Sequence, residues 1–436
     1  MKNLALHWKI LIGMGLGIVA GIIAVQFSGG KSFIVDWIKP FGTIFINALK
    51  LIAIPLIVAS LIKGISDLKD ISKLSAMGGR TIGIYLLTTF FAVSTGLLIV
   101  NVVKPGKLVK EETRQVLMSN FSADASGKIS MAENQQQSGP LQALVDLVPS
   151  NLFEALSGNG NMLQVIFFVI FFGLALILVD PKKGEPIKKF FDSLNEVVLK
   201  LIDLIMLAAP YGVFALLAAL VAESPSADIF KALIGYSLTV LAGLSILVFG
   251  LYPLLVKLFG GKNPGEFYRA ISPAQLLAFS TSSSAATLPV TMERVEEHLG
   301  VSKEVSSFVL PIGATINMDG TSLYQAVAAV FIAQAFGMDL SLSAQLGIVL
   351  TATLASIGTA AVPSAGMVML VIILGQAGIP EAGLALIFAV DRPLDMCRTV
   401  ANVTGDATVS LLVGRSMNKV GPPNIKNWDD NYESVK

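Results

Sequence analysis

Hydrophobic residues gather in long runs that are separated by short polar stretches. Each run is close to the roughly 20 residues that a helix needs to cross the hydrocarbon core of a bilayer. The runs before residue 265 lie at about 10–27, 43–63, 81–103, 161–179, 195–222 and 232–256. The pattern predicts a membrane-spanning helix for each of these six runs.

Beyond residue 265 the apolar stretches are broken by Ser, Thr, Gly, Pro and charges. Two segments there resemble each other, ISPAQLLAFSTSSSAATLPV at 271–290 and LGIVLTATLASIGTAAVPSAG at 346–366. Each has two apolar arms around a small polar tip, and each precedes a helix with embedded polar residues. Such breaks are tolerated at membrane depth only where the backbone is buried in protein or lines a cavity. We therefore expect two re-entrant hairpins in opposite orientations, an inverted repeat typical of secondary transporters.

The composition agrees with a membrane protein. Of the 436 residues, 54% are hydrophobic and 14% are charged, and the mean hydropathy is +0.73. Soluble domains carry about 25% charged residues. The net charge of +1 does not suggest a nucleic-acid partner. The single cysteine, Cys397, excludes an internal disulfide, and two histidines argue against a histidine-rich metal site.

Basic residues predict the orientation. They precede the first run, or follow the second, fourth and sixth: Lys2, Lys9, Lys63, Lys69, Lys73, Arg80, Lys182, Lys183, Lys188, Lys189, Lys257, Lys262 and Arg269. Because cytoplasmic loops carry the excess of Lys and Arg, the N-terminus is expected in the cytoplasm. The polar stretch 104–148 would then be external and poorly ordered, and the tail from Lys419 would be cytoplasmic.

The most informative stretch is DRPLDMCRTVANVTGD at 391–406. Its polar residues recur at helical spacing and share about one third of a helix circumference: Asp391, Asp395, Arg398, Thr399, Asn402 and Asp406. An ionised side chain at the centre of a bilayer costs about 2.5–3.5 kcal/mol. This face must therefore contact protein, water or a charged ligand.

Two interpretations of this face remain open. Asp395 and Arg398 could simply pair as a structural salt bridge. Alternatively, the arginine fork binds a ligand carboxylate and Asp395 binds a ligand ammonium, which together suit an acidic amino acid. Deeper on the same face, a lone buried Asp406 would protonate or bind a cation.

The motif NMDGT at 317–321 lies within an apolar helix. Gly320 can unwind the helix locally, which frees carbonyl oxygens beside Asp319. Hard oxygen ligands of this kind suit a small cation such as sodium. The alternative is a polar kink that neighbouring residues satisfy.

Two further groups are ambiguous when read alone. A hydrolytic role for Ser282, Ser283 or Ser284 would need a base, and no histidine lies in a membrane segment, so we expect no enzyme. These serines fit either a small-residue helix interface or a hairpin tip that faces an anion. The polar residues of GIYLLTTFF at 83–91 would ordinarily be interhelical hydrogen bonds.

Taken together, SSS…TLP, GATINMDGT, ASIGT…VP and LDMCRTVANVTGD closely resemble the dicarboxylate/amino acid:cation symporter family, the glutamate transporter homologues. The resemblance spans nearly the whole chain. It implies an all-α polytopic membrane protein with eight transmembrane helices and two re-entrant hairpins, assembled as a homotrimer that works by an elevator motion.

The resemblance also implies a division of the chain. Segments 1–78 and 140–225 would form a scaffold with the trimer contacts. Segments 79–103 and 226–418 would form a transport domain, with hairpin one at about 265–296 and hairpin two at about 340–376. Residues 104–139 would be an external loop and 419–436 a cytoplasmic tail.

Position by position, the resemblance implies a substrate site and three sodium sites. The substrate residues would be Ser284, Thr321, Val362, Gly366, Asp395, Arg398, Thr399 and Asn402. The first sodium site would comprise Gly313, Asn317, Asn402 and Asp406. The second would comprise Thr315, Ser356, Ile357 and Thr359, and the third Tyr85, Thr88, Thr89, Asn317 and Asp319.

The chain departs from the family pattern at one informative place. Members often carry a second arginine beside the site, at positions that are Ser282 and Met396 here. We expect Arg392 to take over its electrostatic role, one turn from Asp395. The tip of hairpin two has Ala361 and Ser364 where relatives often have glycine, which predicts a stiffer tip.

The resulting expectation is a sodium-coupled symporter for L-glutamate or L-aspartate in the cytoplasmic membrane, surrounded by lipid. A proton-coupled carrier is one alternative, although the resemblance implies that proton-driven relatives tend to lose the carboxylate at Asp406. A C4-dicarboxylate carrier is another, but Asp395 would then face a ligand without an ammonium. An anion channel is the alternative from a different class.

Overall fold

The computed structural model describes residues 6–67, 75–112, 115, 148–157, 162–223, 227–358 and 365–424, and these are helical and contain no β-strand. The N-terminal half comprises α1 (Leu6–Val25), α2 (Gly30–Phe33), α3 (Lys39–Asp67), α4 (Ser75–Val103), α8 (Leu152–Leu156), α9 (Met162–Leu178), α10 (Pro181–Leu207) and α11 (Ala209–Glu223). The C-terminal half comprises α12 (Ala227–Ile246), α13 (Tyr252–Leu255), α14 (Pro264–Thr281), α15 (Ser284–Glu293), α16 (Lys303–Ile316), α17 (Asp319–Ala335), α18 (Leu342–Gly358), α19 (Ala365–Gln376) and α20 (Leu384–Ser416).

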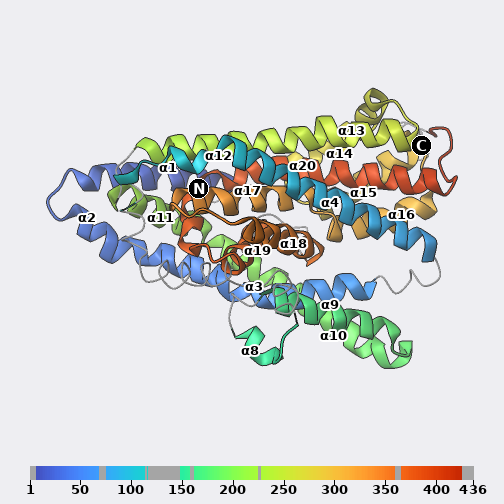
Figure 1. The fold of residues 1–436 in the computed structure, drawn as a ribbon, viewed down its shortest axis with the longest axis horizontal. Helices are drawn as coiled ribbons and strands as arrows, with labels where there is room; N and C mark the ends of the chain where they lie inside the picture. The colour runs from blue at the N-terminus through green and yellow to red at the C-terminus, as the bar shows by residue number, and fades with distance from the viewer. Residues whose placement is uncertain are drawn as a thin grey trace, which may run out of the picture.

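The helices gather into two sets. In the first set, α3 packs against α9, α10 and α11, and α1 packs against α11. In the second set, α20 packs against α12, α14, α16 and α17, and α4 packs against α17. Figure 1 shows α3, α9 and α10 along one side of the molecule, with α4, α12 and α20 along the other. Helices α18 and α19 lie between them and contact α3.

Three described helical segments are long and apolar enough to cross a membrane: Gly30–Lys63, Met77–Leu108 and Asp228–Gly260. They coincide with the second, third and sixth hydrophobic runs. Helices α1 and α9 coincide with the first and fourth runs, and their apolar parts are shorter. The predicted helical class is therefore confirmed.

The prediction of one helix over 195–222 is wrong. The chain there forms two helices, α10 and α11, with a break at Ala208. Pro210 has no N–H for a helical hydrogen bond, and the Ala208 N–H instead donates to the Ile205 carbonyl at 3.0 Å in a tighter turn. Helix α10 also begins earlier than predicted, at Pro181. Its first turns are polar, so a search for apolar runs does not detect them.

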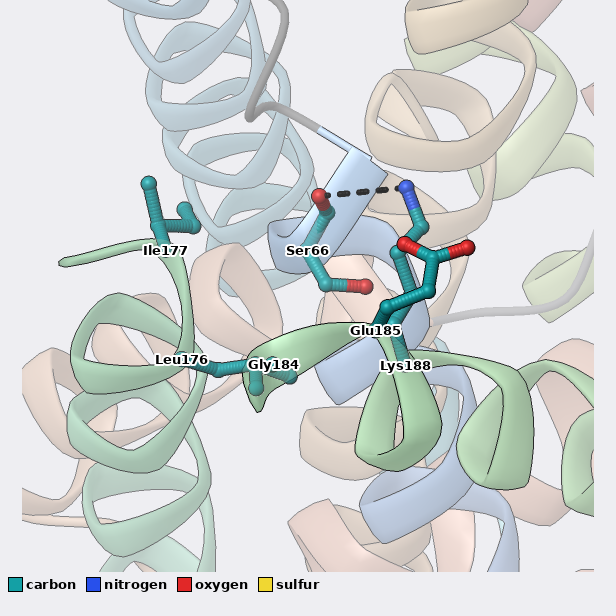
Figure 2. Close-up of a pocket in the computed structure, with 6 residues that line it drawn as sticks. All are labelled: Ser66, Leu176, Ile177, Gly184, Glu185 and Lys188. Atoms are coloured by element: carbon teal, nitrogen blue, oxygen red, sulfur yellow. Dashed lines mark hydrogen bonds between the residues drawn. The ribbon is translucent and has the colours of Figure 1, made fainter. Parts of the chain in front are cut away.

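Helices α3, α9 and α10 meet at a small pocket (Figure 2). The Lys188 ammonium lies 3.5 Å from the Ser66 carbonyl and spans from α10 to the end of α3. The lining residues are Ser66, Leu176, Ile177, Gly184, Glu185 and Lys188. None of the residues expected at the substrate or sodium sites lines this pocket.

The expectation that 104–148 is poorly ordered is wrong for its first residues. A 3₁₀ turn, η3 (Pro105–Leu108), buries Pro105 and Gly106 against α17. The Gly106 N–H donates to Gln334 Oε1 at 3.2 Å. A Cβ on Gly106 would lie 2.6 Å from the Phe331 carbonyl oxygen, so only glycine fits. Most of the expected external loop, 116–139 included, lies outside the described residues.

The segment predicted as the first hairpin forms two helices joined by a tight turn. Helix α14 ends at Thr281, and Ser282 takes a left-handed conformation with φ 52°. Ser283 then caps α15, because its hydroxyl accepts a hydrogen bond from the Ala286 N–H at 3.2 Å. The arms of the second predicted hairpin are α18 and α19, which pack against each other; residues 359–364 between them, including Ala361 and Ser364, lie outside the described residues.

The helix break predicted at NMDGT is present, two to three residues before Gly320. Asn317 (φ −88°, ψ 95°) and Met318 (φ −118°, ψ 46°) separate α16 from α17. Gly320 is helical, and its role is different. A Cβ there would lie 2.5 Å from the Arg398 carbonyl oxygen, so the glycine lets α17 approach α20 closely.

The end of α20 is fastened to the segment that follows the first hairpin. Residues 299–304 and 419–424, named here the C-terminal clip, are joined by an antiparallel bridge between Val301 and Val420. The Ser302 N–H donates to the Lys419 carbonyl at 2.9 Å, and the Gly421 N–H donates to the Gly300 carbonyl at 2.8 Å. Glu304 and Lys419 add an ion pair. The clip therefore links the first hairpin to the last helix.

Replacing Gly300 with alanine should lower the thermal unfolding midpoint of the purified protein. Gly300 has φ +75°, and a Cβ would lie 2.2 Å from the Gly421 carbonyl oxygen. A side chain forced into this region costs about 1–3 kcal/mol. Gly421→Ala is the matched control, because a Cβ there meets nothing within 4 Å. Equal midpoints for the two variants would contradict the clip's contribution to stability.

Candidate substrate and cation site

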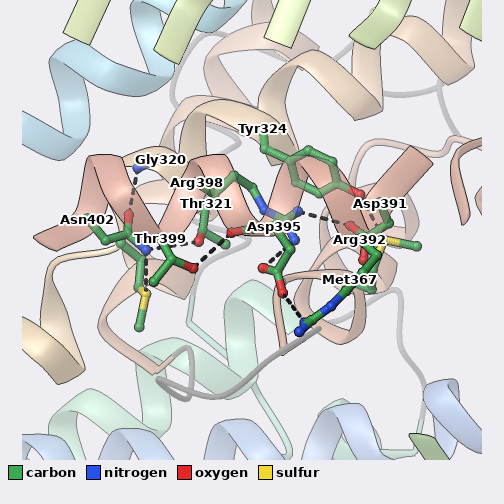
Figure 3. Close-up of polar contacts among 12 residues, drawn as sticks. Gly320, Thr321, Tyr324, Met367, Asp391, Arg392, Asp395, Arg398, Thr399 and Asn402 are labelled. Carbon is green, nitrogen blue, oxygen red and sulfur yellow. Dashed lines mark hydrogen bonds and ion pairs between the residues drawn. The ribbon is translucent and has the colours of Figure 1, made fainter. Parts of the chain in front are cut away.

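The centre of the site is Arg398, whose side chain is 0% exposed. Its Nη2 donates to Asp395 Oδ1 at 2.6 Å, and its Nη1 lies 3.1 Å from Asp391 Oδ1 (Figure 3). The guanidinium carbon lies 3.8 Å from the centre of the Tyr324 ring, a cation–π contact. The structural salt bridge left open by the sequence is therefore present.

The salt bridge does not use all the hydrogen-bond donors of Arg398. Within the described part of the chain, Nε and Nη1 of Arg398 make no hydrogen bond. Buried polar groups are normally hydrogen-bonded, and an unsatisfied charged donor is costly. The guanidinium is thus paired by charge with two carboxylates and still has donors for a further carboxylate.

Asp395 is held between two arginines. Its Oδ2 lies 3.2 Å from Nη1 of Arg392, while its Oδ1 accepts from Arg398. The Asp395 carbonyl also accepts from the Thr399 hydroxyl at 2.8 Å. Pro393 lies between the two residues of the Arg392–Asp395 pair, within α20.

The remaining substrate candidates flank this charged group. Asn402 donates from Nδ2 to the Thr321 hydroxyl at 3.3 Å, and its Oδ1 accepts from the Gly320 N–H at 2.8 Å. At Gly366 a Cβ would lie 2.9 Å from Thr321 Cγ2 and 3.6 Å from Arg398 Nη1. The start of α19 therefore lies directly over the guanidinium.

Six of the eight expected substrate residues are brought together in this way: Thr321, Gly366, Asp395, Arg398, Thr399 and Asn402. Ser284 is buried in the first turn of α15, a helix that also packs against α20. Val362 lies outside the described residues.

Oxygen atoms of the first expected sodium site converge on Gly313. A Cβ there would lie 2.4 Å from Asp406 Oδ1 and 2.2 Å from the Tyr85 hydroxyl. Asn317 donates from Nδ2 to Asp406 Oδ1 at 2.9 Å and to the Asn402 carbonyl at 3.3 Å. The buried Oδ1 of Asn317 has no hydrogen-bond partner within the described residues. All four expected residues therefore meet here, and an amide oxygen remains available for a cation.

The third expected site is organised around Asp319, at the start of α17. The Thr89 hydroxyl donates to Asp319 Oδ1 at 2.6 Å. The Tyr252 hydroxyl donates to Asp319 Oδ2 at 2.9 Å. Thr88 donates to the Tyr85 carbonyl at 3.0 Å within α4. The motif YLLTT thus meets NMDGT, a pairing that helical periodicity alone did not indicate.

The second expected site is described only in part. The Ser356 hydroxyl lies 3.4 Å from the carbonyl of Ile316, which brings the end of α18 to the end of α16. The Thr315 hydroxyl donates to Pro311 within its own helix. Ile357 lies in α18, and Thr359 is outside the described residues.

The donor set suits an alkali cation. Among the described residues there is no cluster of three or more His, Cys, Asp or Glu side chains that could hold a metal. Each candidate site instead offers at most one carboxylate together with amide, hydroxyl and carbonyl oxygens. Hard neutral oxygens with few charges fit a monovalent hard cation better than zinc or iron.

Sequence reasoning missed two tyrosines of the site. Tyr252 holds Asp319, and Tyr324 stacks on Arg398 and donates to the Met367 sulfur at 2.8 Å. The available signal was a tyrosine within an otherwise apolar stretch. A buried tyrosine usually needs a partner for its hydroxyl, but the sequence does not say which helix supplies it.

Long apolar helices around a set of buried charges define a polytopic membrane protein with an internal polar site. A model of the sodium:dicarboxylate symporter family matches residues 6–416, and the chain belongs to that family.

Three relatives show the similarity. The chain is 35% identical to a proton/sodium-glutamate symport protein of Geobacillus stearothermophilus, which covers 100% of this chain and 97% of the relative. It is 36% identical to a proton/glutamate-aspartate symporter of Escherichia coli (strain K12), covering 95% and 94%. It is 35% identical to excitatory amino acid transporter 3 of Oryctolagus cuniculus, covering 93% and 84%.

Proposed function

We propose that the protein is a secondary active symporter that couples inward sodium flow to uptake of L-glutamate or L-aspartate. The observation that carries this proposal is the buried Arg398, which has spare donors and lies next to Asp395. The carboxylate of Asp406 lies about two turns further along α20, and that of Asp319 lies at the start of α17. The guanidinium would bind the substrate's side-chain carboxylate, and Asp395 would bind its ammonium. The names of the relatives, which are glutamate or glutamate-aspartate symporters, support the same substrate class.

Sodium enters this proposal as a co-transported ion. Asp406 with Asn317 and Gly313, and Asp319 with Thr89 and Tyr85, would each hold a cation through oxygen atoms. Burying an ionised carboxylate without a cation raises the free energy of the protein, and a bound cation lowers that free energy. The bound ions and the anionic substrate would then raise each other's affinity by linkage.

In the proposed elevator motion, a transport body would move relative to a scaffold, each as a rigid body. The proposed transport body contains α4 and α12–α20, and several polar contacts tie it together. Arg80 of α4 donates to the Ser416 carbonyl at 2.8 Å, and Gln275 of α14 donates to the Thr404 hydroxyl at 2.8 Å. The clip adds a further link. Helix α4 begins at Ser75, so we propose that the whole helix belongs to this body.

The proposed scaffold contains α1–α3 and α8–α11. The Lys39–Glu223 ion pair, 2.7 Å long, ties the start of α3 to the end of α11. Contacts between the two bodies include Phe45 of α3 and Phe388 of α20, whose ring centroids are 5.2 Å apart. Apolar contacts of this kind have no directional bonds to break, which suits an elevator that slides one body along the other.

Further features of the proposal rest on the sequence pattern and the family. The protein would span the cytoplasmic membrane with eight transmembrane helices and two re-entrant hairpins. Both termini would be cytoplasmic, and three copies would assemble through the scaffold.

Uptake of labelled aspartate and glutamate into proteoliposomes tests the function. With an inward sodium gradient, we expect accumulation above the external concentration, and with potassium or choline in place of sodium we expect none. Accumulation driven by a proton gradient without sodium would favour the proton-coupled alternative. Movement that only equalises the two concentrations would favour a channel.

Replacing Gly313 with alanine should raise the half-saturating sodium concentration. The added Cβ would collide with Asp406 Oδ1 and the Tyr85 hydroxyl, which are both expected near bound sodium. We expect an increase of about tenfold, equivalent to about 1.4 kcal/mol. Gly347→Ala on α18 is the control, since a Cβ there meets nothing within 4 Å. A sodium curve that matches the control would remove Gly313 from the site.

A further inference from the structure

Four ionised side chains of α20 form a chain of alternating charge. Arg392 pairs with Asp395 at 3.2 Å, Asp395 pairs with Arg398 at 2.6 Å, and Arg398 lies 3.1 Å from Asp391. Two positive and two negative charges sum to zero. Every carboxylate in this chain is therefore offset by an arginine before any substrate is bound (Figure 3).

Arg392 and Arg398 have different environments within this chain. Arg398 is fully enclosed and stacks on Tyr324, whereas the Arg392 side chain is 14% exposed. Arg392 contacts the Oδ2 atom of Asp395, the oxygen that Arg398 does not use. Asp395 thus has one arginine on each oxygen, and the arginine on Oδ2 is the more accessible of the two.

The consequence appears when a substrate carboxylate takes the donors of Arg398. If the substrate carries an ammonium, that group can compensate Asp395. If the substrate is a diacid without an ammonium, Arg392 is the arginine that the described residues still offer to Asp395, at 3.2 Å. Without Arg392, such a diacid would bring its negative charge beside a buried carboxylate that no longer pairs with either arginine, which strongly disfavours binding.

We propose that Arg392 is a specificity-determining residue that reduces the discrimination against acidic substrates lacking an ammonium. It acts through Asp395 as a built-in replacement for the ammonium, and so it is a positioning residue. This inference rests on the proposed function, because it assumes that the substrate carboxylate binds Arg398. A specificity role differs from a purely structural role in its effect on affinity. If the Arg392–Asp395 pair only stabilised α20, its loss would change the affinity for all ligands equally.

Competition binding tests the proposal. Labelled L-aspartate is bound to the purified protein in sodium and displaced by unlabelled L-aspartate or by succinate, which has the same carbon skeleton without the ammonium. The readout is the ratio of the succinate Kd to the aspartate Kd. In Arg392→Ala and Arg392→Gln we expect this ratio to rise about tenfold, as for a lost hydrogen bond to a charged group. Arg392→Lys keeps the charge and should restore a ratio near that of the unmodified protein.

The controls separate the possible outcomes. Arg269→Ala removes an exposed arginine of α14 and should leave the ratio unchanged. A ratio that stays constant or falls in both Arg392→Ala and Arg392→Gln would overturn the role of Arg392, as would a failure of succinate to compete with the unmodified protein. If the unmodified protein does not bind aspartate in sodium, the proposed function itself fails, and this inference fails with it. Gln in place of Arg392 keeps a polar side chain, so the test does not depend on the alanine variant folding.

Discussion

Arg398→Ala is expected to abolish uptake and binding of acidic amino acids. The variant removes the only arginine that is fully enclosed at the centre of the described site, and it also leaves Asp391 and Asp395 facing the incoming carboxylate. Truncating one partner of a buried, hydrogen-bonded charge pair costs about 2–5 kcal/mol, or about 30-fold to several thousand-fold in affinity. The loss should be measured as the Kd for labelled aspartate in sodium.

A second variant guards against a trivial loss of folding. Arg398→Gln combined with Asp391→Asn removes one charge of each sign and keeps side chains of similar size, so the buried charge stays balanced. It should unfold near the temperature of the unmodified protein and still fail to bind aspartate. Binding of glutamate or aspartate by either variant with unchanged affinity would show that Arg398 is only structural.

Asp406→Asn is expected to weaken the dependence of transport on sodium. Asn317 donates to Asp406 Oδ1, and asparagine keeps an oxygen that can accept the same hydrogen bond. The variant therefore removes the charge with little change in shape. The half-saturating sodium concentration should rise about 30-fold, the equivalent of about 2 kcal/mol for a lost charged contact.

Ser410→Ala is the matched control for Asp406→Asn. Ser410 lies one turn further along α20 and is equally buried, but it belongs to neither the substrate nor the sodium sites. Its sodium curve should match that of the unmodified protein. If Asp406→Asn gives the same curve as Ser410→Ala, sodium does not bind at Asp406.

The charged face of α20 could be predicted because its origin is local. Residues spaced three or four apart share a helix face whatever the rest of the fold does. The same local logic predicted the helix break in NMDGT, since it depends on residues near in sequence. For Ser282–Ser284 it left a helix interface and a hairpin tip open. It was less successful with 195–222, where Pro210 accompanies a break that divides one apolar run into two helices.

The partners of these residues could not be predicted in the same way. Thr89 and Tyr252 both reach Asp319, yet they are separated from it by 230 and 67 positions in the chain. Tyr324 stacks on Arg398 from another helix. Periodicity says which residues share a face, but it does not say which helix packs against that face. Only the resemblance of YLLTT to the family pattern pointed to Thr89.

The clip and η3 illustrate the same limit. Gly300 and Gly106 look like ordinary loop glycines in the sequence. Each is required because a backbone carbonyl from a distant segment, at Gly421 or Phe331, leaves no room for a Cβ. Close approaches of this kind are properties of the assembled fold.

The central claim is that Arg398 of α20 and the buried carboxylates of Asp319 and Asp406 bind an acidic amino acid and sodium together, so that each ligand raises the affinity for the other. Equilibrium binding of labelled L-aspartate across a wide range of sodium concentration, at constant ionic strength with choline, tests this claim most directly. By linkage, the apparent Kd should fall at least in proportion to the sodium concentration, and aspartate should raise the affinity for sodium by the same factor. An aspartate Kd that is the same in sodium and in choline would contradict the account.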